Sequence, residues 1–166
     1  RPVRSDQTAV HPNPAGVVAI HLNATHRAPP RPHNLAAFEI LREAAKEHAL
    51  PLMLDSFCGT GHSTAALAER HPRHLIIGID QSQARLARHP QASSTNYLLL
   101  QANCEAIWAL MVNEGLTVDA HYLLYPNPWP KPSQLQRRIH GHPGFADLIR
   151  LGGRVELRSN WQRYVE

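Results

Sequence analysis

Cysteine is scarce in this sequence of 166 residues, which contains only Cys58 and Cys104. Two cysteines cannot form a disulfide framework, so we expect a protein of the reducing cytoplasm. No run of about 18 apolar residues occurs, so we predict neither a transmembrane helix nor a membrane partner. No signal-peptide pattern opens the chain. Because the first residue is Arg1 rather than Met, we expect the natural N-terminus to be missing.

The charge balance is only mildly basic. Seventeen Lys and Arg against thirteen Asp and Glu give a formal net charge of +4, which permits a polyanionic partner without requiring one. The excess is local, because seven basic and two acidic residues lie between Lys131 and Arg163. Hydrophobic residues make up 43% of the chain, which argues against a disordered protein and supplies the core of one domain.

Apolar segments alternate with helical patterns along most of the chain. We predict strands at residues 51–57, 74–80, 96–102, 118–125 and 153–159. Helices are predicted at 35–48, within 59–71, and at 81–89 and 104–114, with a helical or irregular stretch over 133–151. This alternation predicts an α/β fold with a doubly wound, mostly parallel sheet. Asn34 is expected to cap the first helix, so we place an N-terminal extension with a proline-rich linker at 1–33 and the domain at 34–166.

Two of the predicted strands end in groups that suit a nucleotide-type ligand. Asp55, at the end of the first strand, is followed by Gly59 and Gly61, which let a ligand approach the backbone. Asp80 ends the second strand, 19 residues after Gly61, where a carboxylate can accept from two ribose hydroxyls. No Gly-Lys-Ser/Thr follows, and Thr64 stands where a dinucleotide site has its third glycine. We therefore predict an adenosine-containing cofactor without a pyrophosphate; the alternative is a packing turn beside a solvated acid.

A proline-locked turn, YPNPWPK at 125–131, follows the fourth predicted strand. The segments LDSFCGTG and GID resemble motif I and the second acidic strand end of class I S-adenosylmethionine-dependent methyltransferases. The turn, with the later stretches QRRIHGHPGF and LGGRVELRSNWQRYV, resembles the tRNA (guanine-N7)-methyltransferase family. This resemblance covers residues 51–166. It implies a Rossmann-like fold, S-adenosyl-L-methionine as cofactor, tRNA as partner, and methylation of guanine N7 in the variable loop.

The resemblance also assigns roles on the cofactor side. Asp55 matches an acid near the methionine part of the cofactor, Asp80 the ribose-binding acid, and Asn103 an acid beside the adenine. The implied cofactor-binding set is Asp55, Gly59, Gly61, Asp80, Asn103 and Asn127. Cys58 and Cys104 are expected to be small buried residues next to this site.

On the substrate side, Asn127 matches the acid of the signature turn and is the implied catalytic residue. Lys131 and Asn160 match substrate-contacting residues of the family. Arg137 and Arg138 follow the turn and suit the phosphate backbone of RNA. The alternative for the arginine pair is a solvated helix face.

The sequence departs from the family pattern at several of these positions. Asn103, Asn127 and Asn160 stand where the family has acids, and Phe57 replaces a usual glycine. At Asn103 the amide oxygen can still accept from the adenine amino group. At Asn127, loss of a charge-assisted hydrogen bond could cost roughly 1.5–3 kcal/mol. That loss corresponds to about tenfold to a hundredfold in rate.

Two alternatives to an active guanine-N7 enzyme follow from these departures. The turn also resembles the Asn/Asp-Pro-Pro-aromatic turn of exocyclic-amino nucleic-acid methyltransferases, with Trp129 and Pro130 transposed. A catalytically weakened relative that still binds the cofactor and RNA is the other alternative. Restoring the acid with Asn127→Asp separates them, because activity should rise if the site is only weakened and fall if Asn suits another base.

We expect no metal site and an incomplete C-terminal region. The histidine pairs at 71 and 74 and at 140 and 142 have no Cys or acid nearby to complete a ligand set. Class I methyltransferase sheets usually have seven strands, whereas five are predicted here, so we expect the last strands to be missing and one sheet edge to be exposed. A monomer or a homodimer is consistent with the sequence.

Overall fold

The computed structural model describes residues 29–90, 92–125 and 142–159 of the chain. Its elements, in chain order, are α2 (Pro32–His48), β1 (Leu52–Ser56), α3 (His62–Arg70), β2 (Leu75–Asp80), α4 (Gln83–Leu86), β3 (Tyr97–Gln101), α5 (Cys104–Asn113), β4 (Ala120–Leu124), α6 (Phe145–Arg150) and β5 (Arg154–Arg158). Each strand lies within the range predicted from the sequence. Among these residues no helix is long and apolar enough to cross a membrane.

The strands form one parallel sheet in the order β3-β2-β1-β4-β5. All five residues of β1 and all six of β2 are buried, as expected for the middle of a sheet covered on both faces. The chain adds β2 and β3 on one side of β1 and then β4 and β5 on the other, so the carboxyl ends of β1 and β4 form the switch point where α/β sheets bind ligands. The predicted parallel, doubly wound fold is confirmed.

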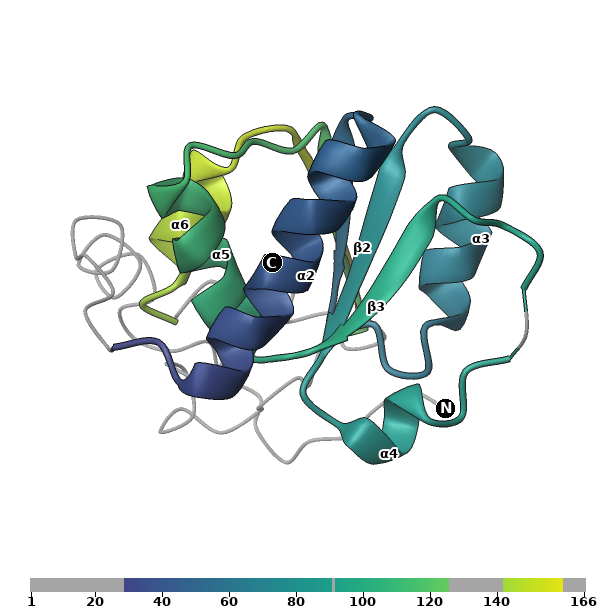
Figure 1. The fold of residues 1–166 in the computed structure, drawn as a ribbon, viewed down its shortest axis with the longest axis horizontal. Helices are drawn as coiled ribbons and strands as arrows, with labels where there is room; N and C mark the ends of the chain where they lie inside the picture. Colours follow the sequence, from purple (N-terminus) through teal and green to yellow (C-terminus); the bar gives the residue numbers. More distant parts are fainter. Residues whose placement is uncertain (1–28, 91, 126–141, 160–166) are drawn as a thin grey trace, which may run out of the picture.

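Helices cover both faces of the sheet (Figure 1). On one face, α2, α5 and α6 bury apolar side chains such as Phe38, Trp108 and Leu148 against β1, β2 and β4. On the other face, α3 places Leu67 and Ala68 against alternate strand residues. The central strands β1 and β2 therefore send successive side chains to two different cores, which is why their segments are apolar at nearly every position.

Helix α2 begins earlier than the sequence suggested. Arg31 is the N-cap and Pro32 occupies the first turn, where proline is tolerated because no hydrogen bond is lost. The prediction that Asn34 caps this helix is therefore wrong. Asn34 instead lies inside the first turn with its side chain turned inward and only 4% of its surface exposed.

The helix predicted at 81–89 is reduced to the single turn of α4. Ser82 caps it by accepting a hydrogen bond from the Arg85 backbone N–H at 3.3 Å. Beyond it the chain turns inward at His89, whose ring bonds to residues of two other segments. Of the stretch predicted as helical or irregular over 133–151, the described part contains α6.

Candidate functional site

Asp80, at the carboxyl end of β2, is surrounded by hydrogen-bond donors. Its Oδ2 accepts from the backbone N–H of Gly59 at 2.9 Å and from the Arg85 guanidinium at 3.4 Å. Its Oδ1 accepts from the backbone N–H of Ser82 at 2.8 Å. Only 2% of the Asp80 surface is exposed, whereas the Arg85 side chain is half exposed. Two backbone donors and one guanidinium therefore fix this carboxyl group at the strand end.

The two glycines after β1 have different functions. Both have positive φ, +61° at Gly59 and +78° at Gly61, which L side chains rarely adopt. A Cβ on Gly61 would lie 2.7 Å from Leu99, so this glycine is needed for packing. A Cβ on Gly59 would meet nothing within 4 Å, so open space lies directly beside the backbone that bonds to Asp80. That space is what a ligand at this strand end requires.

Asn103, which follows β3, is fixed by two hydrogen bonds. Its side-chain oxygen caps α5 by accepting from the Ala106 backbone N–H at 2.9 Å. Its own backbone N–H donates to Oδ1 of Asn34 at 3.0 Å. Asn34 thus connects the first turn of α2 to the start of α5 across 69 positions of sequence. We call Gly59, Asp80, Arg85 and Asn103 the open cluster.

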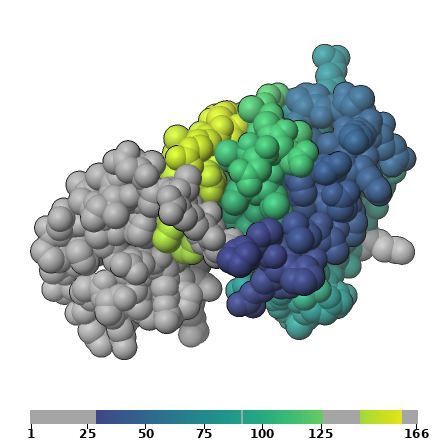
Figure 2. Space-filling model, turned by 60° about the vertical axis from the view of Figure 1, so that its left-hand side comes forward, coloured from purple at the N-terminus to yellow at the C-terminus, as the bar shows by residue number. Residues whose placement is uncertain are grey.

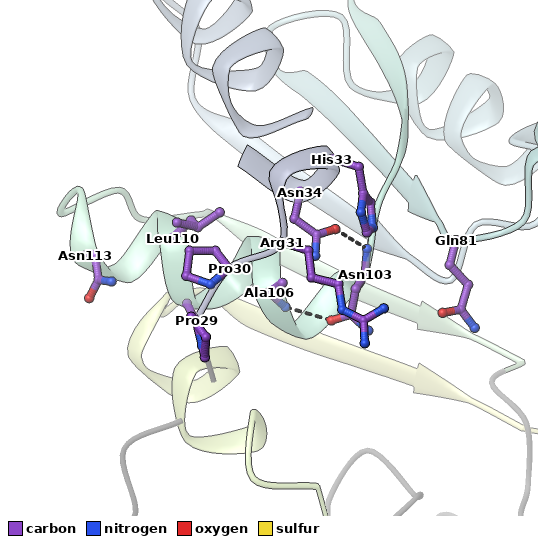
Figure 3. Close-up of a pocket in the computed structure, with 11 residues that line it drawn as sticks. Pro29, Pro30, Arg31, His33, Asn34, Gln81, Asn103, Ala106, Leu110 and Asn113 are labelled. Atoms are coloured by element: carbon purple, nitrogen blue, oxygen red, sulfur yellow. Dashed lines mark hydrogen bonds between the residues drawn. The ribbon is translucent and has the colours of Figure 1, made fainter. Parts of the chain in front are cut away.

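A cavity of about 350 Å³ lies between the first turn of α2 and α5. Arg31, His33 and Asn34 form one wall, Asn103 and the outer face of α5 form another, and Gln81 lies at the end next to Asp80 (Figure 3). Figure 2 shows the start of α2, in purple, beside the green surface of α5. The polar lining consists of amides, a guanidinium and an imidazole, with no carboxylate among the described residues that line it.

Asp55 differs sharply from Asp80 although both lie near strand ends. It is completely buried, and its Oδ2 accepts from the hydroxyls of Ser63 at 2.6 Å and Thr64 at 2.7 Å, both in the first turn of α3. Within the described residues its Oδ1 has no partner. Burial raises the pKa of this carboxyl, and the two hydroxyl hydrogen bonds lower it by less. In this structure Asp55 anchors α3 beneath the glycine turn.

Three further buried polar groups lie on the opposite side of β1. The Trp108 indole N–H donates to Ser56 Oγ at 3.0 Å, and Ser56 Oγ lies 2.7 Å from Nε2 of His121. A hydroxyl has one proton and two lone pairs, so Ser56 Oγ can accept from the indole and either donate to Nε2 or accept from it, according to the His121 tautomer. Nδ1 has no partner in the described part of the chain, and burial lowers the His121 pKa to about 3. We call Asp55, Ser56, Trp108 and His121 the buried cluster.

The backbone at Phe57 explains why a glycine is usual at this position. Its φ is +60°, in the left-handed region. The Phe57 backbone N–H donates to Cys104 Sγ at 3.4 Å, and its ring meets Trp108 edge to face at 6.2 Å. Cys58 and Cys104 are both buried, as predicted, and burial raises the pKa of the Cys58 thiol to about 12. Both thiols are therefore packing groups rather than nucleophiles.

His89 supports the glycine turn and was not anticipated from the sequence. Its Nδ1 donates to the Thr60 carbonyl at 2.8 Å, and its Nε2 accepts from the Tyr97 hydroxyl at 2.7 Å. The interaction joins residues 29 positions apart. No local pattern marks such a contact, because residue 89 reads as the end of a helix. Ser56 and His121 did carry a signal, since both are polar residues in buried strands.

The substrate-side residues predicted from the sequence lie outside the described part of the chain: Asn127, Lys131, Arg137, Arg138 and Asn160. The described range 92–125 ends at Tyr125, whose backbone N–H donates to the Arg158 carbonyl at 2.8 Å. Of the predicted cofactor-side residues, the structure brings Gly59 and Asp80 into direct contact and places Asn103 in the adjoining cavity. It places Asp55 away from that cavity, in the buried cluster.

Comparison with known proteins identifies the family. Residues 49–166 match the model of a family described as "Putative methyltransferase". The chain belongs to this methyltransferase family. The expected cofactor, S-adenosyl-L-methionine, and the resemblance predicted from the sequence are confirmed by this assignment. The open space at Gly59, the fixed carboxylate of Asp80 and the adjoining polar cavity fit an adenosine-containing group.

Curated relatives of this methyltransferase are named tRNA (guanine-N(7)-)-methyltransferases. The protein from Paracidovorax citrulli is 30% identical over 131 residues, covering 75% of this chain and 52% of the relative. The protein from Shewanella halifaxensis is 32% identical over 116 residues, covering 65% and 48%. The chain thus spans about half the length of the curated relatives it matches.

Solved structures support the fold. The antibiotic-resistance methyltransferase Kmr aligns with a TM-score of 0.51 at 23% identity, covering 75% of this chain and 67% of that one. A variant of the 16S rRNA (adenine(1408)-N(1))-methyltransferase from Catenulisporales acidiphilia aligns with a TM-score of 0.50 at 22% identity, covering 70% and 60%. At these identities the likeness concerns the arrangement of the sheet and its helices.

Proposed function

We propose that this methyltransferase transfers a methyl group from S-adenosyl-L-methionine to guanine N7 in the variable loop of tRNA. The observation that carries the cofactor half of the proposal is the open cluster, where the Gly59 backbone donates to Asp80 beside empty space. The substrate half is supported by the turn at 125–131 and by relatives named as tRNA (guanine-N(7)-)-methyltransferases.

In this proposal the open cluster binds the adenosine part of the cofactor. Asp80 accepts from the ribose hydroxyls, since backbone N–H groups hold its oxygens in fixed positions at the strand end. Gly59 lets the ligand approach the backbone, and Asn103 lies against the purine in the cavity beside α5. Asp55 has a supporting role, because its hydrogen bonds to Ser63 and Thr64 hold the helix that follows the glycine turn.

The chemistry requires positioning rather than a general base. When bound, S-adenosyl-L-methionine supplies a methyl group activated by a sulfonium centre. Guanine N7 has a lone pair that forms the new bond to carbon, while the electrons of the carbon–sulfur bond return to sulfur, so no proton is moved. The purine becomes cationic, and the protein must stabilise that charge and hold the atoms in line. We assign this task to Asn127, with Lys131, Arg137, Arg138 and Asn160 holding the RNA.

One feature favours a second candidate, an exocyclic-amino methyltransferase. Asn127 offers one acceptor and no charge, which suits an amino group better than a purine that becomes cationic. The third candidate is a relative with weakened catalysis that still binds cofactor and RNA.

The test is transfer of a labelled methyl group to unmodified tRNA, followed by digestion to nucleosides. We expect label in 7-methylguanosine, and we expect it to disappear from a transcript whose variable-loop guanines are replaced by adenines. Label in an N6- or N4-methyl nucleoside would assign the second candidate. Saturable cofactor binding without label, restored by Asn127→Asp, would assign the weakened relative.

A matched pair of variants connects the reaction to the open cluster. Asp80→Asn should abolish most of the label, because it removes the charge proposed to hold the ribose. Asp119→Asn makes the same chemical change at the amino end of β4, where the carboxylate is exposed and pairs with His74 at 2.9 Å. This control should transfer methyl groups like the wild type. Equal activity of both variants would remove Asp80 from the site.

A further inference from the structure

We propose that Asn103 presents a hydrogen-bond donor, and not an acceptor, to the purine of the cofactor. It would then read a ring nitrogen of the adenine rather than the 6-amino group. The inference deepens the proposed cofactor site and rests on it. It also differs from what the sequence suggested, namely that the amide oxygen of Asn103 accepts from the amino group.

The helix cap decides which end of the amide faces the cavity. The Ala106 backbone N–H lies 2.9 Å from the side chain of Asn103, and that N–H can only donate. The atom opposite it must therefore be the amide oxygen, however the two ends of the amide are assigned. The NH₂ end of Asn103 is then directed away from the helix terminus (Figure 3).

The backbone of residue 103 is held as firmly as its side chain. Asn34 Oδ1 accepts from the Asn103 N–H at 3.0 Å, and the Asn34 side chain is buried. Turning the amide over would put an NH₂ group against the Ala106 N–H and break the helix cap, so the observed orientation is favoured. No described residue accepts from the Asn103 NH₂ group, although Asn103 is half-buried and lines the cavity. This donor is available to a ligand.

A carboxylate at this position would behave in the opposite way. One oxygen of an aspartate would cap α5, and the second would remain an acceptor, suited to the 6-amino group of adenine. Asparagine has a single oxygen, and the cap uses it, so the atom left for the ligand is a donor. Adenine offers N1, N3 and N7 as acceptors for such a donor. Residue 103 therefore sets which edge atom of the purine is recognised.

Calorimetric titration with S-adenosylhomocysteine and its base analogues tests this. The 6-deamino analogue removes the amino group and keeps every ring nitrogen; the 1-deaza, 3-deaza and 7-deaza analogues each remove one ring nitrogen and keep the amino group. Three proteins are compared: the wild type, Asn103→Asp and Asn103→Ser. Aspartate and serine both retain a capping oxygen, so each variant should remain folded, which thermal unfolding will verify.

For the wild type we expect the 6-deamino analogue to bind within about twofold of S-adenosylhomocysteine, and one deaza analogue to bind about three- to tenfold more weakly. Asn103→Ser should lose that deaza effect. Asn103→Asp should lose it too and become sensitive to removal of the amino group by about three- to tenfold.

Two results would overturn the inference. One is a wild type that loses three- to tenfold with the 6-deamino analogue, which would mean that the amide oxygen accepts from the amino group as well as from Ala106. The other is an identical analogue profile in all three proteins. Failure of the proposed function has a different signature, because folded wild-type protein would then bind neither S-adenosylhomocysteine nor any analogue.

Discussion

The open cluster lies beyond the carboxyl ends of the strands, whereas the buried cluster lies on both faces of β1, and the two satisfy their polar atoms in opposite ways. In the open cluster, Asp80 is held mainly by backbone N–H groups and borders empty space at Gly59. In the buried cluster, hydroxyls and an indole supply the donors to Asp55 and Ser56. Among the described residues, the buried side-chain atoms without a partner are Asp55 Oδ1 and His121 Nδ1, both in the buried cluster.

The two arrangements suit different roles: the open cluster suits ligand binding, and the buried cluster suits stabilisation of the fold. Backbone donors have fixed directions and cannot move to another acceptor, so a carboxylate they hold is pre-organised for a ligand at no cost in side-chain entropy. Side-chain donors can rotate, and buried polar atoms without partners destabilise the fold by about 1–3 kcal/mol each. Changes in the open cluster should therefore alter ligand affinity, and changes in the buried cluster should alter stability and its dependence on pH.

The largest effect is expected from His121→Phe. The folded-state pKa of about 3 lies below the ordinary value of 6.5, so the unfolded chain takes up a proton first as pH falls. The wild type should thus lose about 1 kcal/mol of unfolding free energy per pH unit between pH 6 and pH 4. Denaturant unfolding across this range should show a shallower slope for His121→Phe. The partly exposed His48→Phe is the control, and equal slopes for wild type and His121→Phe would contradict the assignment.

The next effect is a loss of ligand affinity in Asp80→Asn. One charged acceptor is replaced by an amide whose NH₂ faces backbone donors, so S-adenosylhomocysteine should bind about tenfold to a hundredfold more weakly. Isothermal titration calorimetry measures the change, with Asp119→Asn as the matched variant. An affinity within twofold of the wild type would place the ribose elsewhere.

Asp55→Asn should change stability by about 1 kcal/mol, and the sign depends on pH. Burial raises the folded-state pKa of Asp55 above 3.8, so its stabilising contribution is complete below that pH and is lost as the pH rises through the folded-state value. The unfolding free energy of the variant should therefore rise relative to that of the wild type between pH 4 and pH 7, as measured by chemical unfolding. If the unfolding free energy of the wild type rises relative to the variant instead, Asp55 is stabilised in its charged form.

The smallest effect concerns Arg85→Met, and it should be an increase in affinity. Oδ2 of Asp80 already accepts from Gly59 and Arg85, so a ribose that donates two hydroxyls must displace the guanidinium. The half-exposed ion pair is worth up to about 1 kcal/mol, and its removal should tighten S-adenosylhomocysteine binding about two- to fivefold. Exposed Arg88→Met, which also removes a charge, should bind like the wild type. Weaker binding by Arg85→Met would mean that the arginine contacts the ligand.

The sequence predicted what depends on short-range pattern. The strand positions followed from apolar segments buried on both faces, and the meeting of Gly59 with Asp80 followed from the ends of parallel strands lying at one edge. It did not predict the role of Asn34 as an acceptor for the start of α5. Capping rules consider only the next three residues, whereas the Asn34 side chain bonds to a residue 69 positions away. The contacts of Ser56 with Trp108 and His121, over 52 and 65 positions, depend on packing that no local rule contains.

The hydrogen bond from the Asn103 backbone N–H to Asn34 Oδ1 constrains both sequence variation among relatives and protein engineering. A fragment beginning at β1 would retain all five strands, yet it would lack the side chain that positions the start of α5 and one wall of the cavity. Position 34 should therefore favour residues whose side chain accepts a hydrogen bond, whereas position 103 can vary in this respect, because its backbone N–H is the donor. The segment ahead of the sheet thus belongs to the proposed cofactor site, and a chimera that exchanges it should be designed with α5 as a unit.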